Sequence, residues 1–185
     1  MRTVARFGAL TCSIAVVIGW WLESVGAGDV YAVGPRVEVV AASKMQLDLV
    51  DWAVDRFDDA GLEAPAVEIE FHDDPDGCSG HLGFAMGDHV DVCTTLVNAM
   101  TRRALLHEMS HVWLDQNVTA ATRARFLALR GLRSWNSSGD PWRLRGFEQA
   151  AEIMAWMLGE RILTAQVPGN RPSELEAAFE LITEG

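Results

Sequence analysis

Five consecutive residues of this chain, His107-Glu108-Met109-Ser110-His111, carry the side chains needed to bind and use a zinc ion. They lie in an apolar run of helical character, and residues four positions apart share one face of an α-helix. His107 and His111 can therefore point their imidazoles at one metal ion. Glu108 follows the first histidine, where its carboxylate can act as a general base beside the open side of the metal. The spacing predicts a zinc site.

A catalytic zinc site usually has three protein ligands and leaves one position for water. Some zinc peptidases place a third histidine six residues after the motif, but that position is Asn117 here. The other histidines, His72, His81 and His89, precede the motif on expected loops or strands. None of the three is ruled out by its position, although isolated histidines of this kind are more often ordinary surface residues.

A better source of the third ligand is the strongly helical run over residues 146–163. Glu148 and Glu152 lie one turn apart on one face of this mostly apolar segment. Burying two carboxylates costs free energy unless they are paired with cations or bound to a metal. We therefore expect both acids to belong to the metal site.

The motif and the later acid pair together resemble the gluzincin branch of the zincin metallopeptidases. In that family the first acid of such a pair binds zinc, and the second hydrogen-bonds the other nitrogen of a ligand histidine. The resemblance implies that Glu148 is the third ligand and Glu152 its supporting partner. Because Glu152 replaces the more usual aspartate, the two roles could also be exchanged. The resemblance covers roughly residues 100–160.

The family often uses a tyrosine or a histidine to stabilise the oxyanion, and this chain has no assignable match. Its only tyrosine, Tyr31, lies near the mature N-terminus. Arg143, Arg145 and His89 could take that role, and nothing in the sequence separates them.

The elements that must position these side chains indicate an α+β fold. We expect one zincin-like domain over residues 28–185, with a small antiparallel or mixed sheet packed on the motif helix and on further helices. Thr94 or Thr95 is expected to cap the motif helix, and Ser173 with Glu176 forms the pattern of a capping box. Helical periodicity is found over residues 43–60, 95–116, 120–132 and 146–163, and strand patterns over 66–71, 80–85 and 90–93.

Two loops leave alternatives open. In residues 134–145, Trp135 and Trp142 could line a substrate cleft or could pin the loop to the core. The aspartates of residues 72–77 could bind calcium, but their spacing does not match an EF-hand loop, so a polar turn is favoured.

Residues 1–27 have the layout of a signal peptide, with an early positive charge, an apolar stretch and small residues before a cleavage point. An uncleaved membrane anchor is the alternative. Cleavage would leave Cys78 and Cys93 as the only cysteines. They could be two free buried thiols, but an even pair in an exported chain favours a disulfide. This disulfide would tie the start of a hairpin around residues 86–89 to its end.

The formal net charge of −11 argues against nucleic-acid binding, which needs a basic surface. The sequence therefore predicts an enzyme that is secreted or held in the cell envelope, binds Zn²⁺ and hydrolyses peptide or protein substrates. The alternative is a zincin-like domain of the cell envelope that keeps zinc as a structural element and binds a partner without cleaving it.

Overall fold

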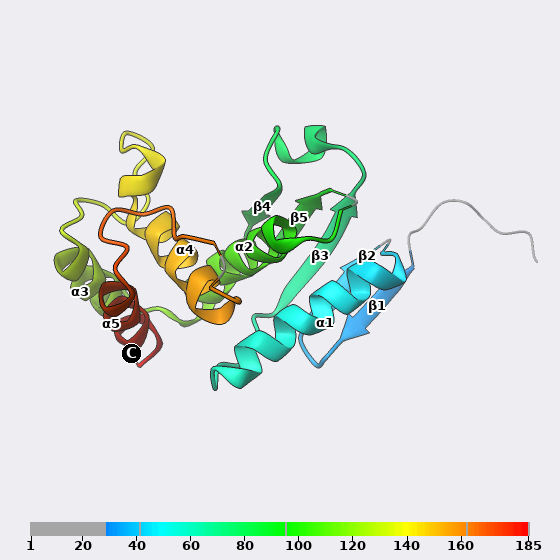
Figure 1. The fold of residues 1–185 in the computed structure, drawn as a ribbon, viewed down its shortest axis with the longest axis horizontal. Helices are drawn as coiled ribbons and strands as arrows, with labels where there is room; N and C mark the ends of the chain where they lie inside the picture. Colours follow the sequence, from blue (N-terminus) through cyan, green and yellow to red (C-terminus); the bar gives the residue numbers. More distant parts are fainter. Residues whose placement is uncertain (1–28, 41, 95, 162, 185) are drawn as a thin grey trace, which may run out of the picture.

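The computed structural model describes residues 29–40, 42–94, 96–161 and 163–184, so the predicted signal segment and Gly185 lie outside the described residues. Within these ranges the chain forms five strands and five α-helices, which confirms the α+β class (Figure 1). No helix in them is long and apolar enough to cross a membrane. The elements are β1 Val30–Val33, β2 Val37–Val40, α1 Lys44–Asp59, β3 Val67–His72, η1 Pro75–Cys78, β4 Gly83–Met86, β5 His89–Cys93, α2 Ala99–Asn117, α3 Ala120–Arg130, η2 Trp142–Leu144, α4 Gly146–Leu158 and α5 Pro172–Thr183.

The five strands form one mixed sheet in the order β1-β2-β3-β5-β4. β2, β3 and β5 are parallel neighbours, whereas β1 and β4 pair antiparallel at the two edges. Alternate residues of β3, namely Val67, Ile69 and Phe71, are buried, and the residues between them are more exposed. This alternation gives the sheet one apolar face for helices to cover.

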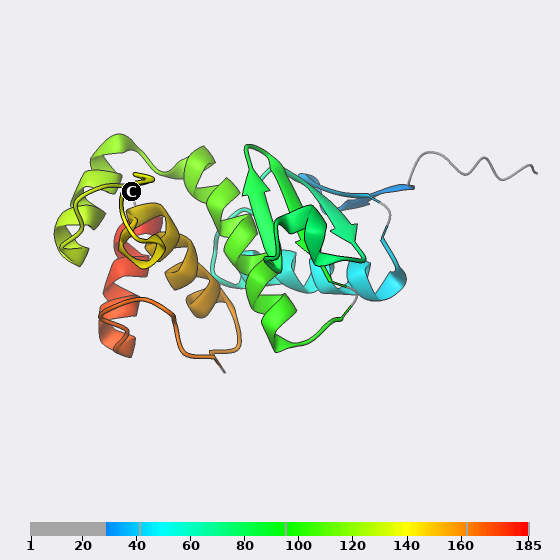
Figure 2. The same cartoon turned by 90° about the horizontal axis from the view of Figure 1, so that it is seen from above.

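Helices α1 and α2 pack on that apolar face, and α2 lies between the sheet and the group formed by α3, α4 and α5 (Figures 1 and 2). The motif helix α2 is therefore covered on two sides. Leu105, Leu106 and Met109 of α2 are fully buried, as are Phe57 of α1 and Ile153 of α4. Burial of such side chains contributes about 1.5–3 kcal/mol each, which fixes the position of α2.

The motif helix begins later than the sequence suggested. Its N-cap is Asn98 and not Thr94, while Thr95 lies outside the described residues. The Asn98 side chain accepts hydrogen bonds from the backbone N–H groups of Met100 and Thr101. Asparagine is among the strongest N-cap residues, and Asn98 has the extended backbone that this position needs. The Thr94 hydroxyl instead accepts from the Leu96 N–H.

Two predictions about the C-terminal helices were wrong. α4 ends at Leu158 and not at residue 163, because Gly159 takes an extended conformation that breaks the helix. The last helix has no capping box: Arg171 is its N-cap without a side-chain bond, and Ser173 lies inside its first turn. Pro172 occupies the first helical position. Its fixed φ favours the helix there, and it has no N–H group that would need a hydrogen-bond acceptor.

The region before α2 agrees with the sequence analysis. β4 and β5 form the predicted hairpin, and Gly87 at its turn has a φ of 66°, which glycine adopts most easily. Cys78 at the end of η1 and Cys93 at the end of β5 are at disulfide-bonding distance. Asp74 accepts hydrogen bonds from the N–H groups of Asp76 and Gly77, so this loop is a polar turn.

Candidate metal centre

Helices α2 and α4 pack against each other and bring together three side chains that could hold a metal ion. His107 and His111 extend from α2 and are buried, while Glu148 extends from the first turn of α4. Glu148 Oε2 lies 3.1 Å from Nε2 of His111 and 3.4 Å from Nε2 of His107. The three ligand atoms all lie within 4.8 Å of one another. A single ion between them could contact all three with small side-chain adjustments.

Glu152 lies one turn further along α4 and is only 1% exposed. Its Oε2 is 3.4 Å from Nδ1 of His107, and its Oε1 accepts hydrogen bonds from Arg103 and, at 2.6 Å, from the Gln166 N–H. Burial would raise the pKa of Glu152, but His107, the Gln166 amide and the charge of Arg103 hold it below its usual range. Glu152 is therefore a carboxylate that can orient His107.

The electrostatics of the two histidines differ. Burial alone would lower the pKa of His107, but hydrogen bonds with Glu148 and Glu152 raise it to about 9. Burial lowers the pKa of His111, with the positive charge of His107 adding to the effect and Glu148 opposing it. Burial would raise the pKa of Glu148, but its bonds with both histidines hold it well below its usual range. Without a metal, these shifts favour a protonated His107 between the carboxylates of Glu148 and Glu152.

The second nitrogen of His111 has a different environment from that of His107. Within the described ranges, the buried Nδ1 of His111 has no hydrogen-bond partner. Instead, the His111 ring packs against Phe147 of α4, with the ring centroids 4.2 Å apart. The orientation of His111 therefore comes from apolar packing, whereas that of His107 comes from Glu152.

Glu108 lies beside this cluster, next to the edge strand β4. Burial raises the pKa of its carboxyl group, while the charge of His107 and a backbone hydrogen bond from Ala85 lower it and the charge of Glu148 raises it further. Gly83 leaves space for this side chain, because a Cβ at position 83 would come within 2.7 Å of Glu108 Cγ. A carboxylate with a raised pKa is well suited to accept and return a proton near neutral pH.

A cavity of about 840 Å³ opens over these residues. Its walls come from β4 and the loop before it, from α2, from the loop after α3 and from the start of α4. Trp142 lines the cavity and stacks on His107, with ring centroids 5.9 Å apart. Trp135 instead is partly buried and packs against Phe126 and Phe147 at the edge of the core. Trp135 therefore anchors the loop to the core, whereas Trp142 lies in the wall of the cavity.

The other residues considered for the site lie at different distances from it. His72 and His89 project from β3 and β5 on the sheet face opposite α2, whereas His81 lines the cavity. Of the oxyanion candidates, Arg145 lines the cavity, and its Nε donates to the Asp140 carbonyl at 3.0 Å. Tyr31 is exposed on the far edge strand β1. In the described ranges, the residues at this cavity that could hold a metal ion are the predicted His107, His111 and Glu148.

Two residues of the site were missed by the sequence analysis. Arg103 lies four residues before His107, so the same helical spacing that links His107 to His111 could have placed it on this face. Gly83 gave no signal, because its role depends on the approach of a strand to α2, and only the three-dimensional structure brings the two together.

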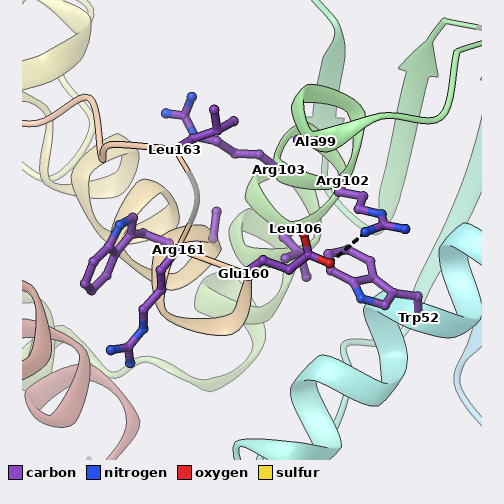
Figure 3. Close-up of a pocket in the computed structure, with 11 residues that line it drawn as sticks. Trp52, Ala99, Arg102, Arg103, Leu106, Glu160, Arg161 and Leu163 are labelled. Carbon is purple, nitrogen blue, oxygen red and sulfur yellow. Dashed lines mark hydrogen bonds and ion pairs between the residues drawn. The ribbon is translucent and has the colours of Figure 1, made fainter.

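A small pocket of about 30 Å³ lies between α1, α2 and the end of α4, and Arg103 borders it as well (Figure 3). The neighbouring Arg102 points the other way: it pairs with Glu160 at 2.7 Å and lies over the Trp52 ring at 5.1 Å (Figure 3). This space is large enough only for a water molecule or two. We interpret it as a packing contact between helices.

Comparisons with protein-family models, with curated proteins and with solved structures found no match to this chain. The interpretation of the site therefore rests on its residues and their geometry.

Proposed function

We propose that this chain is an exported zinc-dependent peptidase of the gluzincin type. The proposal rests on one observation: Nε2 of His107, Nε2 of His111 and Oε2 of Glu148 converge in a cavity that also contains Glu108. Two imidazole nitrogens and one glutamate oxygen are a common donor set for catalytic zinc, so the residues present fit this metal. Export is inferred from the signal-like pattern of residues 1–27.

The roles of the protein groups follow from their positions. His107, His111 and Glu148 would hold zinc, which when bound supplies Lewis acidity at the scissile carbonyl. Glu108 accepts a proton from the attacking water and delivers it to the leaving amine. The surroundings of Glu108 suit both steps, since burial raises the pKa of its carboxyl group.

A peptide substrate is supported by the edge strand β4. This strand is the last in the sheet, and its residues Gly83, Phe84 and Ala85 line the cavity. An edge strand can pair through its backbone with an extended peptide, and neighbouring pockets then select side chains. Trp142 is 41% exposed at the cavity, where it offers apolar surface to a substrate.

The test is a cleavage profile of the purified mature chain on proteome-derived peptides, with and without chelator. We expect zinc at one equivalent or more and cleavage that stops when zinc is removed. Glu108→Gln should keep the zinc but lower kcat by about 10²–10⁴-fold, because it removes the proton acceptor. Glu160→Gln is the matched control, since Glu160 is half exposed and pairs with Arg102 outside the cavity.

Three outcomes separate the alternatives. Zinc content near zero in protein purified without chelator would contradict the metal site. Full activity of Glu108→Gln would contradict the mechanism. If zinc removal melts the fold while no peptide is cleaved, the chain is better described as a zinc-stabilised binding domain of the cell envelope.

A further inference from the structure

The sheet face opposite α1 and α2 carries a second cluster of metal-binding side chains. Residues at alternate positions of β3 and β5 project from this face, because their neighbours in sequence are buried against the helices. The parallel register of the two strands places Glu68 opposite His89 and Glu70 opposite Asp91. His72 follows Glu70 by two residues on β3 and completes the cluster.

The side chains of this cluster converge on Asp91. Its Oδ1 lies 2.6 Å from Nε2 of His72 and 3.2 Å from Nε2 of His89. Glu70 Oε2 lies 3.9 Å from the same nitrogen of His89. Ligand atoms of Glu70, His72 and Asp91 all lie within 4.8 Å of one another. Their side chains are 21–39% exposed, so an ion from solvent can reach them.

The charges and the donor types suit a transition-metal cation. Glu68, Glu70 and Asp91 are three carboxylates on one small patch, and the charge of an ionised carboxylate is relieved by a cation. Imidazole nitrogen is a preferred ligand of Zn²⁺, Cu²⁺ and Ni²⁺, whereas Ca²⁺ and Mg²⁺ favour sites made of oxygen alone. The presence of histidine therefore distinguishes this cluster from an ordinary acidic surface.

We propose that Glu70, His72 and Asp91 form a second divalent transition-metal site, with His89 next to Asp91 as a further donor. The site shares no residue with the centre on α2 and α4 and lies on the opposite face of the sheet. Its ligands come from two adjacent strands, so a bound ion would cross-link β3 and β5 through their side chains. A ligand that binds only the folded state raises stability, so zinc should also raise the unfolding temperature.

The experiment measures bound zinc by equilibrium dialysis at micromolar free Zn²⁺ followed by elemental mass spectrometry. With both sites intact we expect two equivalents. Asp91→Asn should bind one, because the shared carboxylate of the second site is lost. Asp88→Asn is the matched control and should bind two, since Asp88 is an exposed residue in the adjacent hairpin turn.

A double variant isolates the second site from the first. His107→Gln with His111→Gln should still bind one zinc, and adding Asp91→Asn should abolish that binding together with the zinc-dependent rise in Tm. If the double variant binds no zinc, or if Asp91→Asn binds as much as the unsubstituted chain, the second site is refuted. If the double variant does not fold, the comparison of Asp91→Asn with Asp88→Asn decides alone.

The same measurements separate this inference from the proposed peptidase. One equivalent in the unsubstituted chain, lost in Asp91→Asn, would support the second site and contradict the centre on α2. One equivalent of zinc that persists in Asp91→Asn would support the centre on α2 and contradict the second site.

Discussion

Glu152 Oε2 lies 3.4 Å from Nδ1 of His107, while Glu148 Oε2 lies 3.4 Å from Nε2 of the same ring. The two carboxylates thus contact different nitrogens of one imidazole. Of the two carboxylates, only that of Glu148 also lies near Nε2 of His111, at 3.1 Å. One ion beside Glu148 could therefore bind both imidazole rings. This geometry favours Glu148 as the metal ligand and Glu152 as the group that orients His107, over the exchanged roles.

The first prediction concerns these two glutamates. Glu148→Gln replaces a charged ligand and should weaken zinc binding by more than about 100-fold, whereas Glu152→Gln should weaken it by about 10–100-fold, as is typical of groups that orient a ligand. Competition with a chelator of known affinity measures both values. Glu160→Gln, a change on the exposed segment after α4, should leave the affinity unchanged. A larger loss for Glu152→Gln than for Glu148→Gln would support the exchanged roles.

The second prediction is that zinc binding releases a proton. In the metal-free protein the pKa of His107 is raised to about 9, so its imidazole is charged at pH 7.5 and must lose its proton to bind zinc. His111 contributes little, because its pKa is lowered. Calorimetry in buffers of different ionisation enthalpy should show release of about one proton. The affinity should rise with pH up to about 9 and then level off. Heats that do not depend on the buffer would contradict the ion pair with Glu148.

The same pKa has an effect on folding in the absence of zinc. His107 has a higher pKa in the folded state than its ordinary value of 6.5, so folding is favoured by protonation. This contribution is fully present below pH 6.5 and is lost as the pH rises through about 9. Chelated protein should therefore unfold at lower denaturant concentration at pH 9.5 than at pH 6.5.

Much of the site could be predicted because its ligands obey local periodicity. His107 and His111 share a face of α2, and Glu148 and Glu152 share a face of α4, so each pair follows from helical spacing. The sequence also indicated that two acids in an apolar helix need partners. That the two helices face each other follows from tertiary packing, and a resemblance to a family suggested it here.

Other features depend on distant parts of the chain and could not be predicted. Glu70 lies beside Asp91 because of the parallel register of β3 and β5. The alternation of buried and exposed side chains along each strand does not specify that register. The end of α4 at Leu158 was missed because the apolar pattern continues beyond it, although Gly159 was a local signal. The choice of Asn98 over Thr94 as a cap depends on where the backbone turns into α2.

The fourth prediction concerns Gly83. A Cβ at this position would lie 2.7 Å from Glu108 Cγ, so Gly83→Ala must displace the Glu108 side chain or push β4 away from α2. We expect kcat to fall by about tenfold or more, because a general base acts only within hydrogen-bond reach of its proton. Zinc content should not change, since Gly83 contacts no metal ligand side chain among its three nearest neighbours.

Gly139→Ala is the matched control for this change. The nearest atom to a Cβ at position 139 is the Ser137 hydroxyl oxygen at 3.6 Å, an ordinary contact. Its kcat should match that of the unsubstituted chain. Equal activity of Gly83→Ala and Gly139→Ala would argue against a role for Glu108 in the position described.

The last prediction compares two adjacent arginines. Arg103 pairs with Glu152, whose side chain is 2% exposed, whereas Arg102 pairs with Glu160, whose side chain is 41% exposed. Arg103→Met removes one of the two cations beside this buried carboxylate, the other being protonated His107, and should destabilise the metal-free fold by up to about 3–5 kcal/mol. Arg102→Met should cost about 0–1 kcal/mol through the ion pair, because water already solvates both partners. Denaturant unfolding of chelated protein measures both values.

A double variant tests the cause of that difference. Adding Glu152→Gln to Arg103→Met removes the carboxylate charge that has lost one of its two cations and keeps the size of the side chain, so part of the lost stability should return. If the loss came only from the packing of the Arg103 alkyl chain, the second substitution would restore nothing. Recovery would therefore show that Glu152 is held as a buried anion in the folded protein, which is the state needed to orient His107 toward a metal.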